Sequence, residues 1–347
     1  MKIRIILVMA LSLILASTAA FAIKLSIEEK IGRHLYQDKS LSWNETQSCA
    51  TCHNRSAGFA DPTNNRDPED TMASLGDDGY SRGGRNAPTS AYCGYSPTLA
   101  QNTDGEWIGG MFWDGRAQGN ILGDPLAEQA QGPPLNPVEM NMPSVEAIVA
   151  RVESSDYAPL LISYFDDPNF FSDPDSAYDD MARMIAAYER SAELNRFNSR
   201  FDRGDLSDDE QRGLQAFKKA ECDACHSLEI PEGVPGPLFT NYGYANIGIP
   251  MNVLVNTETD LGLGNVVGYE QNGKFKIQTL RNVAKTAPYS HNGYFATLKE
   301  MVRFHLDRGG LEADVEENLV DPVAVELNEQ EINDIIAFLN TLTDEGV

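Results

Sequence analysis

Two segments of the chain combine a pair of cysteines with a histidine at the same spacing. They read Cys49-Ala50-Thr51-Cys52-His53 and Cys222-Asp223-Ala224-Cys225-His226. Two cysteines three positions apart can each form a thioether to one vinyl group of a haem, and the adjacent histidine can offer a neutral imidazole nitrogen to the iron. The spacing therefore predicts two covalently bound haems, with His53 and His226 as the proximal iron ligands.

A zinc site or a thioredoxin-like dithiol would be the alternative use of such cysteine pairs. A zinc site needs two further ligands for each pair, and Cys93 is the one thiol that remains. A redox dithiol has no need of the histidine that both copies carry. We therefore favour haem, expect no intrachain disulfide, and interpret Cys93, between Tyr92 and Tyr95, as a buried and inert thiol.

The first 22 residues have the pattern of a secretory signal. Lys2 and Arg4 precede an apolar run from Ile5 to Leu15, and small residues follow up to Ala20-Phe21-Ala22. We expect cleavage after residue 22 and a mature protein in the periplasm or at the cell surface, where haem of this type is attached. An uncleaved anchor is the alternative, and no later stretch is long and apolar enough to span a membrane.

The chain is strongly acidic, with 52 acidic against 27 basic residues and a formal net charge of −25. Such a charge disfavours binding to nucleic acid or to an anionic lipid surface. It could steer a basic protein partner to the molecule, or it could simply keep a secreted protein dissolved. The sequence leaves open whether the chain forms a homodimer.

The elements that must position the two motifs are mostly helices. Apolar residues at helical spacing predict helices over Leu25–Tyr36, from Ser144 onward, over Tyr178–Asp202, from Ser207 onward with Glu210 completing a capping box, and over Leu327–Leu342. Residues 61–86 are expected to form a loop over the first haem, and residues 234–280 loops with short strands. A helix leads into each motif, so the fold is predicted to be mainly α, with cytochrome c-like domains at 23–203 and 204–347 that carry one covalent haem each.

Further segments, in order, resemble the bacterial di-haem cytochrome c peroxidase / MauG family over essentially the whole mature chain. They are Gly83–Thr89, Phe112–Arg116, Leu126–Pro133, Asn136–Met140, Leu280–Ala284 and Ala287–Gly293. The resemblance implies a peroxidase that uses H2O2 and a secreted or periplasmic redox partner or protein substrate.

The resemblance places Gln129 and Glu139 above the iron of the first haem, with Pro133 between them. A carboxylate there can take a proton from H2O2 and return it to the leaving oxygen, while the amide holds the peroxide. The alternative is that Glu139 caps the Ser144 region and Gln129 faces solvent. Many relatives hold a loop histidine on this iron until reduction, but no histidine lies between His53 and His226. The first iron is therefore expected to be open without prior reduction.

The resemblance places the distal ligand of the second haem at His305, in the helix after His291-Asn292-Gly293. Methionine or tyrosine holds this position in the two named branches of the family. Met301, one turn earlier, is the competing ligand, and a surface location is the other alternative for His305. Two histidine ligands give a lower potential than histidine with methionine. They disfavour an electron-fed peroxidase and favour storage of an oxidising equivalent on the second haem.

The resemblance implies roles for six other residues. Trp113 would lie between the haems and carry charge, although it could also be a core aromatic. Asn86 and the carbonyls of Thr286 and Pro288 would bind Ca²⁺ between the haems. Arg281 and His291 would contact a haem edge or a propionate.

Three functions remain in consideration. The first is a MauG-like oxidase that draws electrons from an aromatic residue of a partner protein. The second is a cytochrome c peroxidase that reduces H2O2 to water with electrons from a small redox protein. The third is a di-haem electron carrier without catalysis.

Overall fold

The computed structural model describes residues 23–347, so the expected signal at residues 1–22 lies outside the described part of the chain. The described chain is mainly helical, as predicted. Its helices are α1 (Ile27–Gln37), α2 (Cys49–Cys52), α3 (Pro62–Arg66), α4 (Pro125–Ala130), α5 (Gly132–Leu135), α6 (Val145–Glu153), α7 (Ala158–Phe165), α8 (Pro174–Glu189), α9 (Asp208–Lys219), α10 (Gly264–Val267), α11 (Leu298–Asp307) and α12 (Glu329–Asn340). Its strands are β1 (Ala100–Gln101), β2 (Trp107–Ile108), β3 (Tyr244–Ala245) and β4 (Phe275–Lys276). Within residues 23–347, no helix is both long and apolar enough to cross a bilayer.

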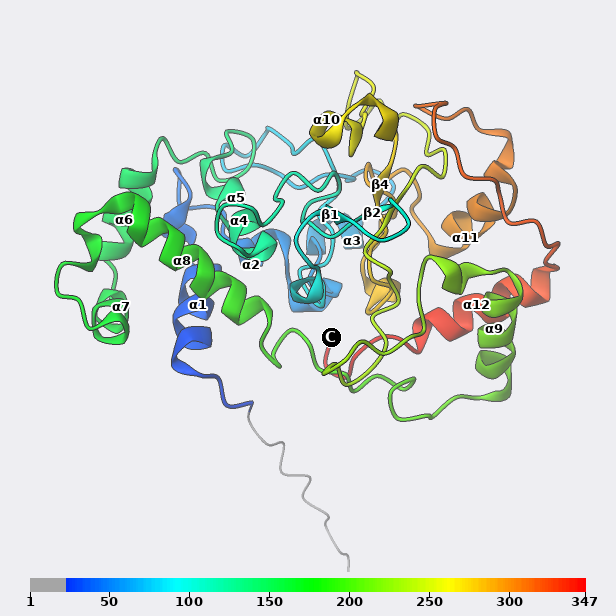
Figure 1. Ribbon diagram of the computed structural model, residues 1–347, viewed down its shortest axis with the longest axis horizontal. Helices are drawn as coiled ribbons and strands as arrows, with labels where there is room; N and C mark the ends of the chain where they lie inside the picture. The colour runs from blue at the N-terminus through cyan, green and yellow to red at the C-terminus, as the bar shows by residue number, and fades with distance from the viewer. Residues whose placement is uncertain (1–22) are drawn as a thin grey trace, which may run out of the picture.

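Each half of the chain contains one pair of crossing helices. The helices α1 and α8 pack together in the first half, and α9 and α12 pack together in the second. Figure 1 shows these two pairs toward opposite ends of the molecule, with the strands between them. The largest apolar core surrounds α1 and α8, and a smaller one lies between α9 and α12.

A glycine lies at the crossing point of each helix pair. A Cβ atom at Gly32 of α1 would lie 1.8 Å from the Met184 carbonyl oxygen of α8. One at Gly213 of α9 would lie 1.9 Å from the Asp334 carbonyl oxygen of α12. Both distances are far below van der Waals contact, so only glycine lets the backbones approach this closely. The two halves therefore share a close helix crossing at a glycine, in addition to the cysteine motif.

We expect Gly213→Ala to lower the free energy of unfolding by about 1–3 kcal/mol, because the added methyl group must push α9 away from α12. Denaturant unfolding followed by circular dichroism measures this change. Gly83→Ala is the control, since a Cβ there would lie 3.6 Å from its nearest neighbour, the Arg85 carbonyl oxygen. Equal stability of the two variants would contradict the close crossing of the helices.

The predicted starts of four helices are confirmed to within two residues, whereas the helix predicted from Tyr178 begins four residues earlier, at Pro174. Ser144 caps α6 by accepting the Ala147 backbone N–H at 3.3 Å. Ser207 and Glu210 form the expected capping box of α9, in which Glu210 accepts the Ser207 backbone N–H at 2.8 Å. The helices α1 and α12 begin two residues later than predicted, because Ser26 and Asn328 act as their N-caps.

The prediction of one long helix over residues 178–202 is wrong. Helix α8 ends at Glu189, and the following residues form turns that lead to the second half. Phe197 has a φ of +48° and its ring lies against the Arg281 guanidinium, with 4.4 Å between them. Phe201 packs on Phe239, with ring centroids 5.3 Å apart. Phe197 and Phe201 have helical spacing, but they lie after the end of α8 and pack on Arg281 and Phe239 of the second half.

The short strands join the two halves of the chain. Strand β1 pairs with β2, β3 pairs with β4, and a single bridge connects Ile108 with Gly243. The β4 residue Lys276 donates its backbone N–H to the Trp113 carbonyl oxygen at 2.8 Å. Residues 234–280 thus contain the predicted loops and short strands, together with the short helix α10 that was not predicted, and they bring Trp113 to the boundary between the halves.

Candidate active site

A cavity of about 600 Å³ in the first half contains the residues predicted to surround the first haem. Its lining includes Cys49, Cys52 and His53, and the predicted catalytic set Gln129, Pro133, Glu139 and Trp113. Residues 61–86, predicted to form a loop, begin with the short helix α3, and the loop after it contributes Ser74, Leu75 and Gly83–Asn86 to the same lining. Among these predicted residues, the structure brings together Cys49 and Glu139, which lie 90 positions apart, around one space.

His53 is oriented for iron ligation by the backbone. Its Nδ1 atom lies 3.1 Å from the Phe59 carbonyl oxygen. A carbonyl can only accept, so Nδ1 carries the proton and Nε2 keeps a free lone pair. Burial lowers the pKa of His53, which keeps the ring neutral. His53, together with the two cysteines of α2, thus fits a covalently attached haem.

Glu139 is the one carboxyl among the predicted catalytic residues. Burial raises the pKa of Glu139, while the nearby Arg116 and a hydrogen bond from Asn136 lower it. The Asn136 amide donates to the Glu139 carboxylate at 2.7 Å. The carboxylate therefore lines the cavity in a fixed position, instead of capping the Ser144 region. Its raised pKa suits a group that takes up and returns a proton.

Gln129 and Pro133 reach the cavity from two short consecutive helices, α4 and α5. The preceding loop is anchored by Glu128, which accepts backbone N–H groups from Gly119 at 2.7 Å and Ile121 at 2.6 Å. This anchor fixes the chain that leads into α4, and the Gln129 side chain lines the cavity.

Charged residues of the cavity wall were missed by the sequence analysis. Arg85 forms ion pairs of 2.7 Å with both Asp114 and Asp260. Arg116 also pairs with Asp114 and lies 3.6 Å from the Phe112 ring centroid. Arg85, Asp114 and Arg116 belong to the recognised segments and could have been proposed from them. Asp260 carries no sequence signal, since it reaches Arg85 across 175 residues.

In the second half, His226 and His305 are oriented in the same way as His53. The Nδ1 atom of His226 lies 3.0 Å from the Phe239 carbonyl oxygen, and that of His305 lies 2.8 Å from the Met301 carbonyl oxygen. Burial, and to a smaller extent the closeness of His305, lowers the pKa of His226 to about 4. His305 is half-buried on α11, and burial lowers its pKa also. The two imidazoles therefore lie near each other, both neutral.

Met301, the competing ligand, lies in an apolar cluster. It packs against a group formed by Ile249, Phe295 and Phe304. This environment accounts for the methionine without an iron bond.

Trp113 is fixed from both halves of the chain. Its indole N–H donates to the Asn86 carbonyl oxygen at 2.9 Å, and its own carbonyl accepts the Lys276 N–H. Asn86 in turn donates its backbone N–H to the His291 carbonyl oxygen at 2.8 Å. Trp113 thus lines the first cavity and lies at the boundary with the second half.

The oxygens predicted for calcium accept no hydrogen bond in the described part of the chain. Asn86 is 6% exposed, and its amide nitrogen donates to the Met72 carbonyl oxygen at 3.1 Å. This bond leaves the side-chain oxygen as the free acceptor. Within residues 23–347, no hydrogen bond ends on that oxygen or on the Thr286 and Pro288 carbonyls. Uncharged oxygens of this kind suit Ca²⁺, so calcium binding remains a prediction.

Arg281 and His291 have protein partners in the structure. Arg281 is fully buried, pairs with both Asp202 oxygens at 3.0 and 2.9 Å, and donates to the Pro237 carbonyl at 2.7 Å. His291 stacks on Phe275 with ring centroids 3.5 Å apart. Their expected contacts with a haem edge or propionate therefore stay predictions, and the main role of Arg281 is to hold Asp202.

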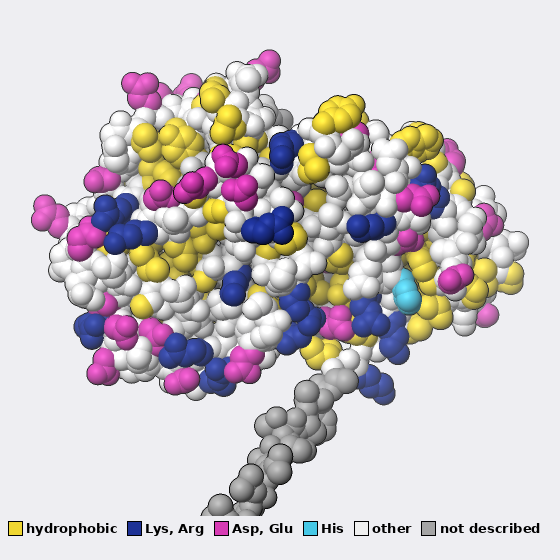
Figure 2. Space-filling view, turned by 180° about the vertical axis from the view of Figure 1, so that it is seen from behind, with side chains coloured by type: hydrophobic (Ala, Val, Ile, Leu, Met, Phe, Trp, Pro, Cys, Tyr) yellow, Lys and Arg dark blue, Asp and Glu magenta, His cyan; other side chains and the backbone are white. Residues whose placement is uncertain are grey.

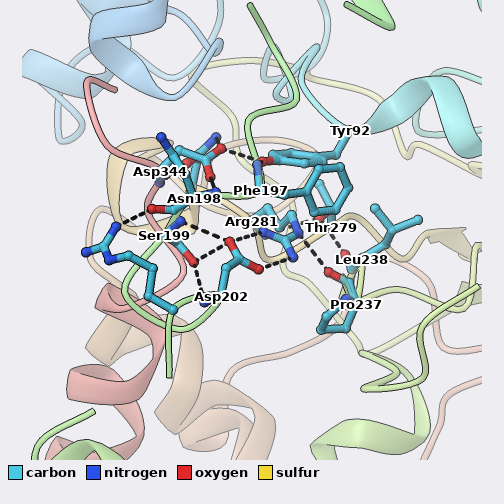
Figure 3. Close-up of polar contacts among 12 residues, drawn as sticks. Tyr92, Phe197, Asn198, Ser199, Asp202, Pro237, Leu238, Thr279, Arg281 and Asp344 are labelled. Atoms are coloured by element: carbon cyan, nitrogen blue, oxygen red, sulfur yellow. Dashed lines mark hydrogen bonds and ion pairs between the residues drawn. The ribbon is translucent and has the colours of Figure 1, made fainter. Parts of the chain in front are cut away.

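Arg281 belongs to a buried polar network between the halves, which Figure 3 shows. The Tyr92 hydroxyl donates to the Asp344 carboxylate and accepts the Phe197 backbone N–H at 3.0 Å. Asp344 also accepts the Asn198 backbone N–H at 3.2 Å. The network therefore joins the first half, the segment after α8 and the C-terminal residues.

We expect Tyr92→Phe to lower the free energy of unfolding by about 1–3 kcal/mol, because Asp344 and the Phe197 N–H would lose a buried partner. Thermal unfolding followed by calorimetry measures the loss. Tyr269→Phe is the matched control, since Tyr269 is 77% exposed and the same change should stay within about 0.5 kcal/mol. An unchanged Tyr92→Phe protein would show that the network adds nothing to stability.

Comparison with known proteins agrees with this site. Residues 27–211 match the family model described as di-haem cytochrome c peroxidase. The methylamine utilization protein MauG of Paracoccus denitrificans is 37% identical over 291 residues, which cover 79% of this chain and 73% of that protein. The cytochrome c peroxidase Ccp of Escherichia coli is 32% identical over 324 residues, covering 90% and 57%.

A solved structure shows the same fold. The diheme peroxidase BthA from Burkholderia thailandensis superposes with a TM-score of 0.80 at 26% identity, covering 93% of this chain and 88% of that one. A family with two haems accounts for the two cysteine motifs. The chain therefore belongs to the di-haem cytochrome c peroxidase / MauG family, and it is an oxidoreductase that acts on peroxide.

Proposed function

We propose that this protein is a MauG-like di-haem oxidase of the periplasm. The domains at 23–203 and 204–347 would each carry one covalent haem, and H2O2 would react at the haem of His53. The oxidising equivalents would be shared through Trp113 with the haem of His226 and His305. Electrons would then be drawn from an aromatic residue of a partner protein.

The observation that carries this proposal is the pair His226 and His305. Both rings present Nε2 because Nδ1 lies against a backbone carbonyl, and the closeness of His305 helps to lower the pKa of His226. Met301 packs against the apolar cluster of Ile249, Phe295 and Phe304. Because two histidines lower the potential of a haem, the second site favours holding an oxidising equivalent over receiving electrons from a donor.

The residues around the first cavity support the peroxide step. Iron would supply the electrons that cleave the O–O bond. Glu139, which has a raised pKa and is fixed by Asn136, would accept the peroxide proton and return it to the leaving oxygen. Gln129 would hold the substrate by hydrogen bonds, and Pro133 would narrow the space above the iron.

The molecular surface bears on the partner. The face in Figure 2 carries acidic, basic and hydrophobic side chains intermixed, with basic groups across its middle. This face therefore does not present one sign of charge, although the chain as a whole is strongly acidic. A partner that binds there would need shape and apolar contacts as well as charge.

The test is a single addition of H2O2 to the fully oxidised protein without a donor, followed by visible and near-infrared absorption. Prompt loss of both ferric signals, with a near-infrared band for charge shared between two irons, is the expected result. A response only after one-electron reduction would instead assign a reductively activated peroxidase.

The peroxidase is the second candidate, because the chain is also similar to a cytochrome c peroxidase over 90% of its length. It would reduce H2O2 to water with electrons from a small redox protein. No response to peroxide in either redox state would leave a di-haem electron carrier.

A further inference from the structure

Lys276 is a buried cation without an acidic partner. It is 6% exposed, and its Nζ atom donates to the Ser96 hydroxyl at 3.0 Å and to the Gly109 carbonyl oxygen at 2.8 Å. Within residues 23–347, no carboxylate forms an ion pair with it. Buried cations are usually neutralised by an anion, so this charge acts on its surroundings without cancellation.

Two tyrosine rings lie close to this charge. The Nζ atom lies 5.5 Å from the ring centroid of Tyr242 and 5.3 Å from that of Tyr244. Both tyrosines lie beside the loop that carries Trp113, because Gly243 bridges to Ile108 and Lys276 pairs with the Trp113 backbone. A cation at this distance stabilises the neutral rings and opposes any positive charge on them.

Neither tyrosine hydroxyl has a good proton acceptor. The Tyr242 hydroxyl is buried and donates to no atom of the described chain. The Tyr244 hydroxyl donates to the Gly109 carbonyl at 2.7 Å, and a carbonyl is a very weak base. A phenol loses an electron easily only when its proton can leave for a base at the same time. Oxidation of either ring would therefore leave a phenol cation next to an ammonium group.

Trp113 differs in both respects. An indole can lose an electron and persist as a cation without losing its N–H proton, which here donates to the Asn86 carbonyl. Among the described residues, no lysine or arginine lies over the Trp113 ring. Of the three aromatic groups, Trp113 is therefore the one that can be oxidised at the lowest cost.

We propose that Lys276 confines the oxidising equivalent to Trp113 and the haems by making Tyr242 and Tyr244 hard to oxidise. This inference rests on the function proposed above and identifies a positioning residue for that function. In the suppressed reaction, one electron would pass from a tyrosine to the oxidised haem pair, which would be reduced by one equivalent, and the phenol proton would stay in place.

The test uses the haem-loaded protein and H2O2 without a partner, at about pH 6. Burial lowers the pKa of Lys276 to about 7, so its amine is protonated under this condition. Tyrosyl radicals are followed by freeze-quench electron paramagnetic resonance, and oxidised tyrosines by peptide mass spectrometry. Lys276→Met should give several-fold more oxidation at Tyr242 and Tyr244 than the wild type, and Lys276→Arg should stay near the wild type.

Matched variants make the outcome specific. Lys218→Met removes an exposed lysine of α9 and should change nothing. Adding Tyr242→Phe and Tyr244→Phe to Lys276→Met should remove the new signal. The wild-type protein alone also tests the inference, so the test does not depend on whether a variant folds. A strong tyrosyl signal from Tyr242 or Tyr244 in the wild type would overturn the inference.

The failures of the two proposals are distinguishable. If Lys276→Met reacts with peroxide as the wild type does but shows no added tyrosine oxidation, the confinement by Lys276 is wrong and the oxidase function stands. If neither protein reacts with peroxide, the proposed function is overturned, and this inference with it.

Discussion

Glu139→Gln is expected to slow the reaction of the oxidised protein with H2O2 by a factor of about 10²–10⁴, the usual contribution of a general acid–base group. The amide keeps the size of the side chain and can keep its contact with Asn136, but it cannot accept the peroxide proton. Stopped-flow absorption of the haem band gives the second-order rate constant directly.

The control for this change is Glu153→Gln, which alters an exposed carboxyl at the end of α6 and should leave the rate constant unchanged. The pH profile offers a second readout. Burial raises the pKa of Glu139, and the base must be ionised, so the wild-type rate should fall as pH drops through this raised pKa. Full reactivity of Glu139→Gln would remove the carboxyl from the mechanism.

His305→Ala should convert the second haem from a six-coordinate, low-spin form to a five-coordinate or water-bound, high-spin form. The change follows because α11 would no longer offer an imidazole opposite His226. Electron paramagnetic resonance of the oxidised protein measures the spin state, and the near-infrared band after H2O2 should be lost with it.

Met301→Leu is the matched control for the second haem. Leucine keeps the apolar packing with Phe295 and Phe304, so the spectrum should be that of the wild type. A high-spin second haem in Met301→Leu, together with an unchanged spectrum in His305→Ala, would reverse the assignment of the ligand.

The sequence was most informative where one residue type serves one chemical purpose. The first cysteine motif, and the positions of Gln129 and Glu139 implied by the family resemblance, predicted residues that line a single cavity. The capping box of Ser207 and Glu210 was predictable for the same reason, because capping depends on neighbours three residues apart.

Interactions between distant segments could not be predicted in this way. The ion pair of Arg85 with Asp260 and the contacts of Lys276 with Ser96 and Gly109 depend on how the two halves meet. Periodicity also misled the analysis at Phe197, which has helical spacing but packs on Arg281 after the helix has ended. A pattern of apolar residues indicates that a side chain is buried, but it does not indicate which part of the chain buries it.

The bond between Tyr92 and Asp344 has a consequence for the order of assembly, since it joins residues 252 positions apart. Closing so large a loop is entropically costly, so we expect this contact to form after the nearer contacts within each half. Each cysteine motif lies after a helix of its own half, Cys49 twelve residues after the end of α1 and Cys222 three residues after the end of α9. It can therefore be presented to the attachment machinery before the halves dock. Docking would then be a late step, and it would seal two sites that have already received their haems.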